Sequence, residues 1–298
     1  MTEKQLKEIL TDGKSLIEQR LKEYMSLIAD ENDPVKKAME YSLMIGGKRL
    51  RPILTLQFCK ACGVSEERAV PFACAVEMIH TYSLIHDDLP CMDNDDLRRG
   101  KPSCHIAFGE ENALLAGDGL LNLAFETVSG RFGDIIIPAE NQIKAIGYLS
   151  SCSGIDGMIG GQTLDLMSEN KSISLQQLIR IHSLKTGAMI RSACVLGAIV
   201  AGADKKTVEC AEIYGNNIGL AFQIIDDILD ITGDEKALGK PVGSDRENKK
   251  STFPTLLGIK TSREYAQELT QSAKEALSAF ENAEFLSSLA DYLLHREK

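Results

Sequence analysis

The chain has 298 residues, of which 44% are hydrophobic and 26% are charged, a composition that excludes wholesale disorder. Its formal net charge of -10 argues against a nucleic-acid-binding protein, which needs a basic face, and suits a protein that holds divalent cations. No uninterrupted apolar run reaches the roughly 20 residues of a membrane-spanning helix. The N-terminal sequence is amphipathic and contains acids, which is typical of neither a signal nor a transit peptide. We therefore expect a cytoplasmic protein with no membrane span and no nucleic-acid partner.

Helical periodicity dominates the chain. In chain order, helices are expected over residues 3–29 and 34–45, after Pro52, and over 65–88, 111–131, 139–152, 156–167, 174–201, 204–232, 252–280 and 283–295. Residues 89–105 are expected to form an ordered polar loop, and the run 134–137 is too short to found a sheet. No linker or solenoid repeat divides the chain. We predict an all-α protein with one domain over residues 1–298, a single large helical bundle around a central apolar cavity.

The eight cysteines are scattered, most of them in apolar helical stretches where cysteine acts as a small hydrophobic residue. Cys59 and Cys62 form one CxxC pair, but no second pair of cysteines or histidines completes a zinc site. Core packing is the favoured interpretation of this pair, and we expect reduced thiols rather than disulfides.

The densest polar feature is the sequence HDDLPCMDNDDLRRGKP at residues 86–102. Asp87 and Asp88 end a long helix that Pro90 does not continue, so Asp93 is presented from a loop that can fold back towards Asp87. Clustered carboxylates repel one another unless cations lie among them. Mg²⁺ suits carboxylate and phosphate oxygens, and the basic run LRRGK that follows is suited to phosphate. The alternative is a solvated acidic loop with a compensating basic end.

A second acidic motif, AFQIIDDILD at residues 221–230, lies within an apolar helix. Asp226 and Asp230 are four residues apart and share a helix face, and Gln223 and Asp227 are related in the same way. Carboxylates that an apolar helix turns into a bundle core need metals or cationic partners. An amphipathic helix whose solvent side happens to be acidic is the alternative.

A basic motif, GGKRLRP at residues 46–52, places three cations on a tight turn after two glycines. Such a turn can surround an oxyanion with fixed charges and open amide donors. A C-terminal helix cap with cations favoured by the helix dipole is the alternative. Together the three motifs predict two phosphorylated ligands. One would be held through Mg²⁺ between the aspartates, and the other directly by lysine and arginine, with an apolar pocket between them.

In order and spacing, these motifs resemble those of the trans-isoprenyl diphosphate synthases, close to the bacterial farnesyl diphosphate type. The likeness runs over nearly the whole chain and includes GGQTLDL at 160–166, LKTGAM at 184–189 and GKPVGSD at 239–245. The resemblance implies the isoprenoid synthase fold, a homodimer, and Mg²⁺, with three ions per site once substrate is bound. It implies a head-to-tail condensation of isopentenyl diphosphate with dimethylallyl or geranyl diphosphate through an allylic carbocation.

The resemblance also implies roles for single residues. It assigns Mg²⁺ binding at the allylic diphosphate to Asp87, Asp88, Asp93, Asp226 and Asp230. It completes the catalytic set with Asp227, Lys185, Thr186 and Gln223, the last two at the reacting centre. It assigns direct contact with the allylic diphosphate to Arg98, Lys185 and Lys240, the last in a stretch expected to act as a lid, 239–251. It assigns binding of isopentenyl diphosphate to Gly47, Lys48, Arg51, His80 and Arg99.

Product length is expected to depend on Tyr82 and Ser83, five and four residues before the first aspartate. By resemblance, Tyr82 and the two extra residues inside DDLPCMD indicate the bacterial farnesyl type, in which a bulky ring stops elongation near fifteen carbons. Helix geometry does not establish this, because Tyr82 lies about 140° around the helix from Asp87. An ordinary core tyrosine is the alternative.

Other functions remain open beside a farnesyl diphosphate synthase. The nearest is a geranylgeranyl diphosphate synthase with a deeper pocket. A terpene cyclase takes a single diphosphate and has no use for the basic motif. A non-catalytic regulatory subunit of a prenyl synthase is a different class, but such subunits tend to lose aspartates that are intact here. A plain Ca²⁺ binder leaves the basic motif unexplained, and no EF-hand loop is present.

Overall fold

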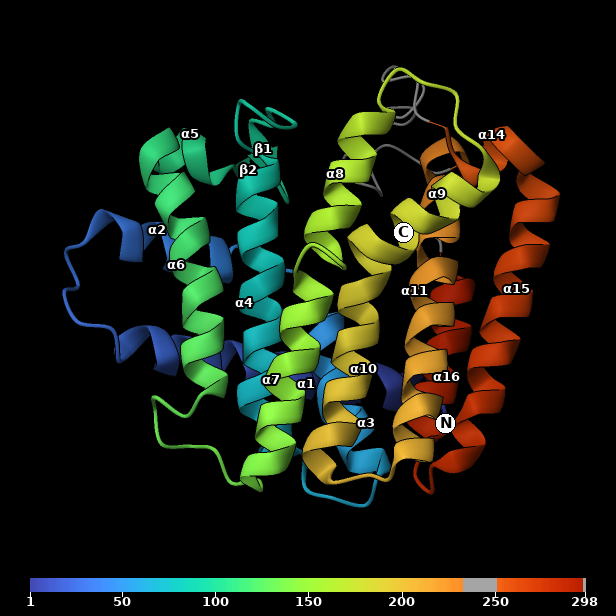
Figure 1. Ribbon diagram of the computed structural model, residues 1–298, viewed down its shortest axis with the longest axis horizontal. Helices are drawn as coiled ribbons and strands as arrows, with labels where there is room; N and C mark the ends of the chain where they lie inside the picture. Colours follow the sequence, from blue (N-terminus) through green and yellow to red (C-terminus); the bar gives the residue numbers. More distant parts are fainter. Residues whose placement is uncertain (233–250, 297–298) are drawn as a thin grey trace.

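The computed structural model describes residues 1–232 and 251–296, and almost all of its regular structure is helical. Figure 1 shows long helices running side by side in one bundle, which confirms the predicted all-α class. Lys240 and nearly all of the expected lid lie outside the described residues.

The elements follow one another with short connections. The first half of the chain forms α1 (Glu3–Ser26), α2 (Pro34–Met44), α3 (Leu50–Ala61), the 3₁₀ turn η1 (Glu66–Ala69), α4 (Val70–Asp87), β1 (Leu97–Arg98), β2 (Lys101–Pro102), α5 (Cys104–Phe108), α6 (Glu110–Val128) and α7 (Ala139–Ser153). The second half forms α8 (Met158–Ser168), α9 (Leu175–His182), the π-helical turn η2 (Ser183–Gly187), α10 (Ala188–Ala201), α11 (Lys205–Thr232), α14 (Phe253–Leu257), α15 (Ile259–Ala276), the 3₁₀ turn η3 (Leu277–Ala279) and α16 (Glu284–Leu294).

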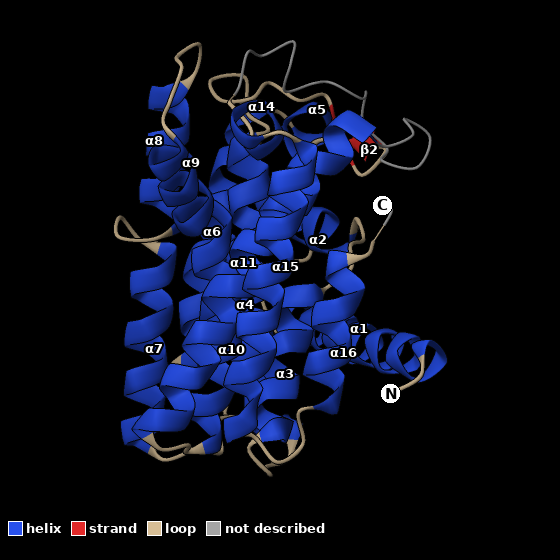
Figure 2. Ribbon diagram, turned by 90° about the vertical axis from the view of Figure 1, so that its right-hand side faces the viewer, coloured by secondary structure: helices blue, strands red, loops and turns tan. Residues whose placement is uncertain are grey.

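Helices α4, α10 and α11 form the centre of the bundle. Helix α6 packs along α4, α10 lies between α3 and α11, and α15 packs along α11. Figure 2 shows α1 projecting from the side of the bundle at its N-terminal end. The larger apolar cluster joins α1, α3, α4, α6, α10 and α16, and a smaller one joins α9, α11, α14 and α15. Burial of each large apolar side chain in these clusters contributes about 1.5–3 kcal/mol.

Local sequence signals explain where several helices begin. The Asp33 side chain accepts hydrogen bonds from the N–H groups at the start of α2, and Pro34 occupies the first helical position, where its missing N–H costs nothing. The Ser65 hydroxyl accepts from the N–H of Glu67 and starts η1, which leads into α4. Pro71 lies in the first turn of α4, as expected.

Three expected elements differ from the structure. The helix expected over 174–201 contains the π-helical turn η2, a kind of irregularity that often marks functional sites. The helix expected over 252–280 breaks at Gly258, whose φ of 80° lies in the left-handed region that favours glycine. The loop expected over 89–105 contains a two-stranded antiparallel hairpin, β1–β2, and the start of α5.

One continuous stretch, Leu175–Ala201, is long and apolar enough to cross a membrane by length and composition, with a mean hydropathy of 1.4. However, 67% of that window is buried inside the protein. Its C-terminal part, α10, packs against α3 and α11, as a core helix of a bundle does.

Candidate active site

The first acidic motif folds back on the end of α4. Asp87 is the last residue of α4, and Asp93 lies in the loop that follows. The N–H of Asp93 donates to the carbonyl oxygen of Asp87 at 2.8 Å, and the N–H of Asn94 donates to that of Leu89 at 3.1 Å. These bonds confirm the loop geometry that the sequence predicts, and they make Asp87 and Asp93 one acidic group.

The surroundings of Asp87 disfavour its charged form. Burial, together with the negative charges of Asp93 and Asp88, raises the pKa of Asp87 to about 6, while the Lys185 ammonium acts in the opposite direction. A carboxylate held in this way is stabilised by a further cation beside it. Perturbed acids of this kind gather at functional sites.

Asp88 is 2% exposed and is bound by Arg98. Arg98 Nε lies 3.0 and 3.1 Å from the two carboxylate oxygens of Asp88, and Arg98 Nη2 contacts Asp88 and, at 3.3 Å, Asp95. Charge-assisted pairs of this kind are strong. The expected Mg²⁺ ligand Asp88 and the expected diphosphate contact Arg98 therefore bind each other here, and both roles stay predictions.

Lys185 projects from the π-helical turn η2. Its Nζ lies 2.6 Å from Asp165 Oδ2, in the motif GGQTLDL on α8. Burial alone would lower the pKa of Lys185, but Asp165, with help from Asp87 and Asp93, outweighs burial and raises it. A Cβ at Gly161 would lie 2.1 Å from the backbone N of Lys185, so α8 approaches this turn only because residue 161 is glycine. Asp165 thus orients Lys185, a role that the sequence analysis missed.

The same turn, which contains Thr186, packs against α11. A Cβ at Gly219 would lie 2.9 Å from the Cα of Gly187, so the turn and α11 touch through two glycines. Gln223 lies one turn further along α11, and its Nε2 donates to Asp226 Oδ2 at 3.1 Å. The two residues expected at the reacting centre, Thr186 and Gln223, therefore come from neighbouring elements.

Asp226 is bound by an arginine from the end of the chain. Arg296 Nη2 lies 2.6 Å from Asp226 Oδ1 and donates to the carbonyl oxygen of Phe222 at 2.9 Å, and its guanidinium carbon lies 3.8 Å from the centre of the Phe222 ring. Burial raises the pKa of Asp226 even though Arg296 opposes this. Arg296 was not predicted as a site residue, because no motif surrounds it.

The neighbouring aspartates of α11 differ in their surroundings. Asp227 is buried, accepts the N–H of Phe253 at 2.9 Å and lies 3.5 Å from His182 Nε2. Asp227 therefore anchors the start of α14, and its expected catalytic role stays a prediction. Asp230 lies one turn after Asp226 and is partly exposed.

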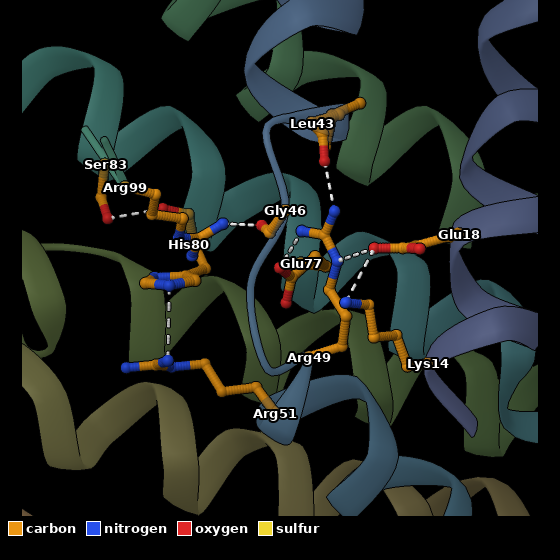
Figure 3. Close-up of polar contacts among 10 residues, drawn as sticks. All are labelled: Lys14, Glu18, Leu43, Gly46, Arg49, Arg51, Glu77, His80, Ser83 and Arg99. Atoms are coloured by element: carbon orange, nitrogen blue, oxygen red, sulfur yellow. Dashed lines mark hydrogen bonds and ion pairs between the residues drawn. The ribbon is translucent and has the colours of Figure 1, made fainter. Parts of the chain in front are cut away.

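The basic motif borders a cavity of about 1010 Å³. Its lining includes all five residues expected to bind isopentenyl diphosphate, Gly47, Lys48, Arg51, His80 and Arg99. Figure 3 shows Arg51 reaching towards His80 from the start of α3. Apolar side chains from α1, α10, α11 and α16 complete the wall. The structure therefore brings this predicted group together.

His80 is kept neutral by its neighbours. Burial, with the positive charges of Arg51 and Arg99, lowers the pKa of His80 well below its ordinary value of 6.5. Arg51 Nη1 lies 3.4 Å from His80 Nε2, so a neutral ring that accepts there carries its proton on Nδ1. Burial also lowers the pKa of Arg51, although an arginine remains charged.

Gly47 is required by its backbone and by Arg99. Its φ is 131°, and a Cβ there would lie 2.6 Å from Arg99 Nη1. Arg99 itself donates to the carbonyl oxygen of Gly46. The glycine pair thus lets the guanidinium rest on the backbone of the basic motif.

The two expected chain-length residues lie on α4. Tyr82 is 5% exposed, its ring packs edge-on against His86, and its hydroxyl has no hydrogen-bond partner within residues 1–232 and 251–296. Ser83 Oγ donates to the carbonyl oxygen of His80 at 2.9 Å. Their role in product length is not tested by these contacts.

The two acidic motifs lie at the same end of the bundle, where α4 and α11 both end (Figure 1). The charge of Asp226 also acts on Arg51 and that of Lys48 on Asp226, so the second acidic motif adjoins the basic one. Among the residues that the structure describes, no three His, Cys, Asp or Glu side chains form a preassembled metal cage. The arrangement can therefore hold one anion by direct cationic contact and a second through cations bridging the two acidic motifs.

Comparison with known proteins places this geometry in a family. Residues 32–288 match the family model described as polyprenyl synthetase. Farnesyl diphosphate synthase of Bacillus subtilis is 44% identical over 298 residues, covering all of both chains. Geranylgeranyl diphosphate synthase of Cyanophora paradoxa is 47% identical over 87% of this chain and 86% of its own. The apo crystal structure of an FPP/GFPP synthase from Zymomonas mobilis has a TM-score of 0.86 and 38% identity, over 97% of this chain and 99% of its own. The chain therefore belongs to the polyprenyl synthetase family of prenyltransferases.

Proposed function

We propose that the protein is a farnesyl diphosphate synthase, which condenses isopentenyl diphosphate with dimethylallyl and then geranyl diphosphate. The observation that carries the condensation is the division of the site into an acidic side, with Asp87 and Asp226, and a basic side, with Arg51 and His80. Two diphosphate substrates that are held by different means need such a division. The farnesyl product rests on the resemblance of Tyr82 and DDLPCMD to the bacterial farnesyl type. Chromatography of the products tests it: a fifteen-carbon product is expected, and a twenty-carbon product would favour the geranylgeranyl alternative.

The residues present fit Mg²⁺. The donor set is carboxylate oxygen, which Mg²⁺ prefers, and burial leaves Asp87 short of a neutralising charge. Mg²⁺ is usually held through one or two carboxylates and the phosphates of the substrate rather than by an all-protein cage. Asp87 and Asp93 would hold Mg²⁺ at the first acidic motif, and Asp226 and Asp230 would hold Mg²⁺ at the second. When bound, Mg²⁺ supplies the positive charge that stabilises a departing diphosphate.

The side chains of the chain divide the remaining work. Lys185, oriented by Asp165, would contact the allylic diphosphate and stabilise the charge that develops as it leaves. Lys48 and Arg51 would hold the other diphosphate, so that the double bond of isopentenyl diphosphate meets the allylic carbocation in a fixed orientation. The apolar bundle excludes water that would quench the cation. The released diphosphate is the expected acceptor of the proton.

Arg296 should compete with Mg²⁺ for Asp226, because the two cations need the same carboxylate oxygens. Replacing Arg296 with glutamine removes the competing charge and is expected to tighten divalent-cation binding by about 2- to 5-fold, the range of a partly exposed ion pair. Electron paramagnetic resonance of Mn²⁺, titrated without substrate, measures this affinity. Arg263→Gln removes an exposed charge on α15 and should leave it unchanged. Equal Mn²⁺ affinity in wild type and Arg296→Gln would refute the competition.

Tyr82→Ala is expected to lengthen the product by at least one five-carbon unit, because it removes the ring that we propose as the floor of the elongation cavity. Tyr82→Phe is the matched control and should leave the product unchanged, since the tyrosine hydroxyl has no hydrogen-bond partner in the described part of the chain. Product chromatography and a thermal melt of each variant check this. A stable Tyr82→Ala variant that still stops at fifteen carbons would show that another residue sets the length.

We propose that the chain acts as a cytoplasmic homodimer, as one polyprenyl synthetase domain over residues 1–298. One observation supports self-association: Leu114 and Leu115, neighbours on α6, are 48% and 51% exposed. A contiguous apolar patch on a folded protein marks an interaction site, and these two side chains are where we place it. Light scattering coupled to size-exclusion chromatography tests the dimer, and a monomer at micromolar concentration would contradict it.

A further inference from the structure

Arg49 is a buried arginine in the middle of the basic motif, and its side chain is 0% exposed. Its Nη1 lies 2.6 Å from Glu77 Oε1 on α4, its Nε lies 3.2 Å from Glu18 Oε1 on α1, and its Nη2 donates to the carbonyl oxygen of Leu43 on α2 (Figure 3). All three guanidinium nitrogens are therefore occupied by groups of the protein. Arg49 lines the cavity as Arg51 does, but its guanidinium faces Glu77, Glu18 and Leu43, whereas that of Arg51 reaches towards His80.

The backbone at Arg49 is unusual. Its φ of 51° and ψ of 33° lie in the left-handed region, which costs energy for any residue with a Cβ. Gly46 and Gly47, with φ of 110° and 131°, precede it, and α3 begins directly after it. No side chain caps this helix start. The turn is therefore held by tertiary contacts. The Arg49 side chain supplies contacts to three other helices, α1, α2 and α4.

The ion pair between Arg49 and Glu77 also affects the charge of the cavity that the basic motif borders. Glu77 is the acidic residue among the described residues that line the cavity, lies one turn before His80 on α4 and is 2% exposed. An uncompensated carboxylate there would repel a diphosphate and attract Arg51 and Arg99 to itself. Arg49 neutralises Glu77 and leaves the positive charge of Arg51 and Arg99 for an anion.

We propose that Arg49 and Glu77 are positioning residues for the isopentenyl diphosphate site. Their buried ion pair, steadied by Glu18, holds the left-handed turn so that Lys48 and Arg51, on either side of Arg49, converge on one diphosphate. Both residues line the cavity, but their charged groups are taken up by each other, so we assign neither a direct contact with the substrate. The identity of the substrate, isopentenyl diphosphate, rests on the proposed function. The presence of an anion site at the basic motif does not.

Steady-state kinetics give the first test. Arg49→Met should raise the KM for isopentenyl diphosphate by about 10- to 100-fold, by analogy with the loss of residues that orient metal ligands. The KM for the allylic substrate should change less than about 2-fold. Arg49→Lys keeps the positive charge but loses the planar set of five N–H donors. Its KM for isopentenyl diphosphate should lie between that of wild type and that of Arg49→Met. Equal increases in both KM values, or no increase, would overturn the proposal.

Calorimetry separates this inference from the proposed function. Inorganic pyrophosphate titrated in excess EDTA reports only the basic site, because the acidic motifs need metal to hold an anion. Wild type should bind, Arg51→Gln should lose binding, and Arg49→Met should weaken it about 10-fold or more. If wild type makes no prenyl product, the proposed function fails while this comparison still decides the role of Arg49. Wild-type pyrophosphate affinity in a folded Arg49→Met variant would overturn the inference.

A matched control distinguishes positioning from general stability. Arg191 on α10 is 24% exposed, pairs with Glu212 and lies outside the cavity lining, so Arg191→Met should lower the melting temperature without changing pyrophosphate affinity. If Arg49→Met does not fold, the double variant Arg49→Met/Glu77→Met removes both charges and avoids a lone buried carboxylate. It should fold and still bind pyrophosphate weakly. Wild-type affinity in the double variant would overturn the inference.

Discussion

Replacing Asp87 or Asp226 with alanine is expected to lower kcat by about 10²- to 10³-fold or more, while the fold stays intact. Each substitution removes a carboxylate that we propose as a ligand of the Mg²⁺ that would hold the allylic diphosphate. The loss should fall mainly on kcat, because the negative charge on the departing diphosphate grows towards the transition state. Steady-state assays at saturating Mg²⁺ measure it.

The loss of activity in these variants should far exceed any loss of stability, although Asp226→Ala also leaves Arg296 without its carboxylate partner. Burial raises the pKa of Asp87 to about 6 and also raises that of Asp226, so neither charge is favoured by the fold alone. Asp12→Ala is the control variant: it also removes a carboxylate from a helix, but an exposed one on α1. It should leave both kcat and the free energy of unfolding unchanged. Wild-type turnover in Asp87→Ala or Asp226→Ala would contradict the proposed metal site.

Removing divalent cations is expected to abolish condensation, with full recovery when Mg²⁺ is restored. The acidic motifs would repel an allylic diphosphate without a cation, whereas the basic motif would still bind isopentenyl diphosphate. Calorimetry with each substrate in excess EDTA should therefore detect isopentenyl diphosphate but not dimethylallyl diphosphate. Turnover in excess chelator, or equal binding of both substrates there, would contradict this division.

Most of the architecture follows from patterns that act locally. The 3.6-residue periodicity predicts the bundle, and Pro34 and Ser65 act at helix starts as their chemistry requires. The return of Asp93 to the end of α4 also follows from the sequence, because Pro90 disfavours continuation of the helix. These effects depend on residues a few positions apart, which is why the sequence is enough.

The features that the sequence did not predict depend on distant partners. Arg296 meets Asp226 across 70 positions, and Asp227 meets the N–H of Phe253 across 26. The π-helical turn at Lys185 cannot be predicted from apolar spacing, and helix α8, which approaches it closely at Gly161, belongs to a separate part of the sequence. A signal for Asp165 was present, because it lies within GGQTLDL, but only the folded chain joins it to Lys185.

The most direct test of the central claim is the release of pyrophosphate, measured with each substrate alone and with both together in Mg²⁺. Net release of one diphosphate should need the other substrate, because the double bond of isopentenyl diphosphate captures the allylic cation before the diphosphate recombines with it. Rapid release is predicted with isopentenyl and dimethylallyl diphosphate together, and at most slow hydrolysis with either alone. No release with both, or release from dimethylallyl diphosphate alone at the same rate, would contradict it.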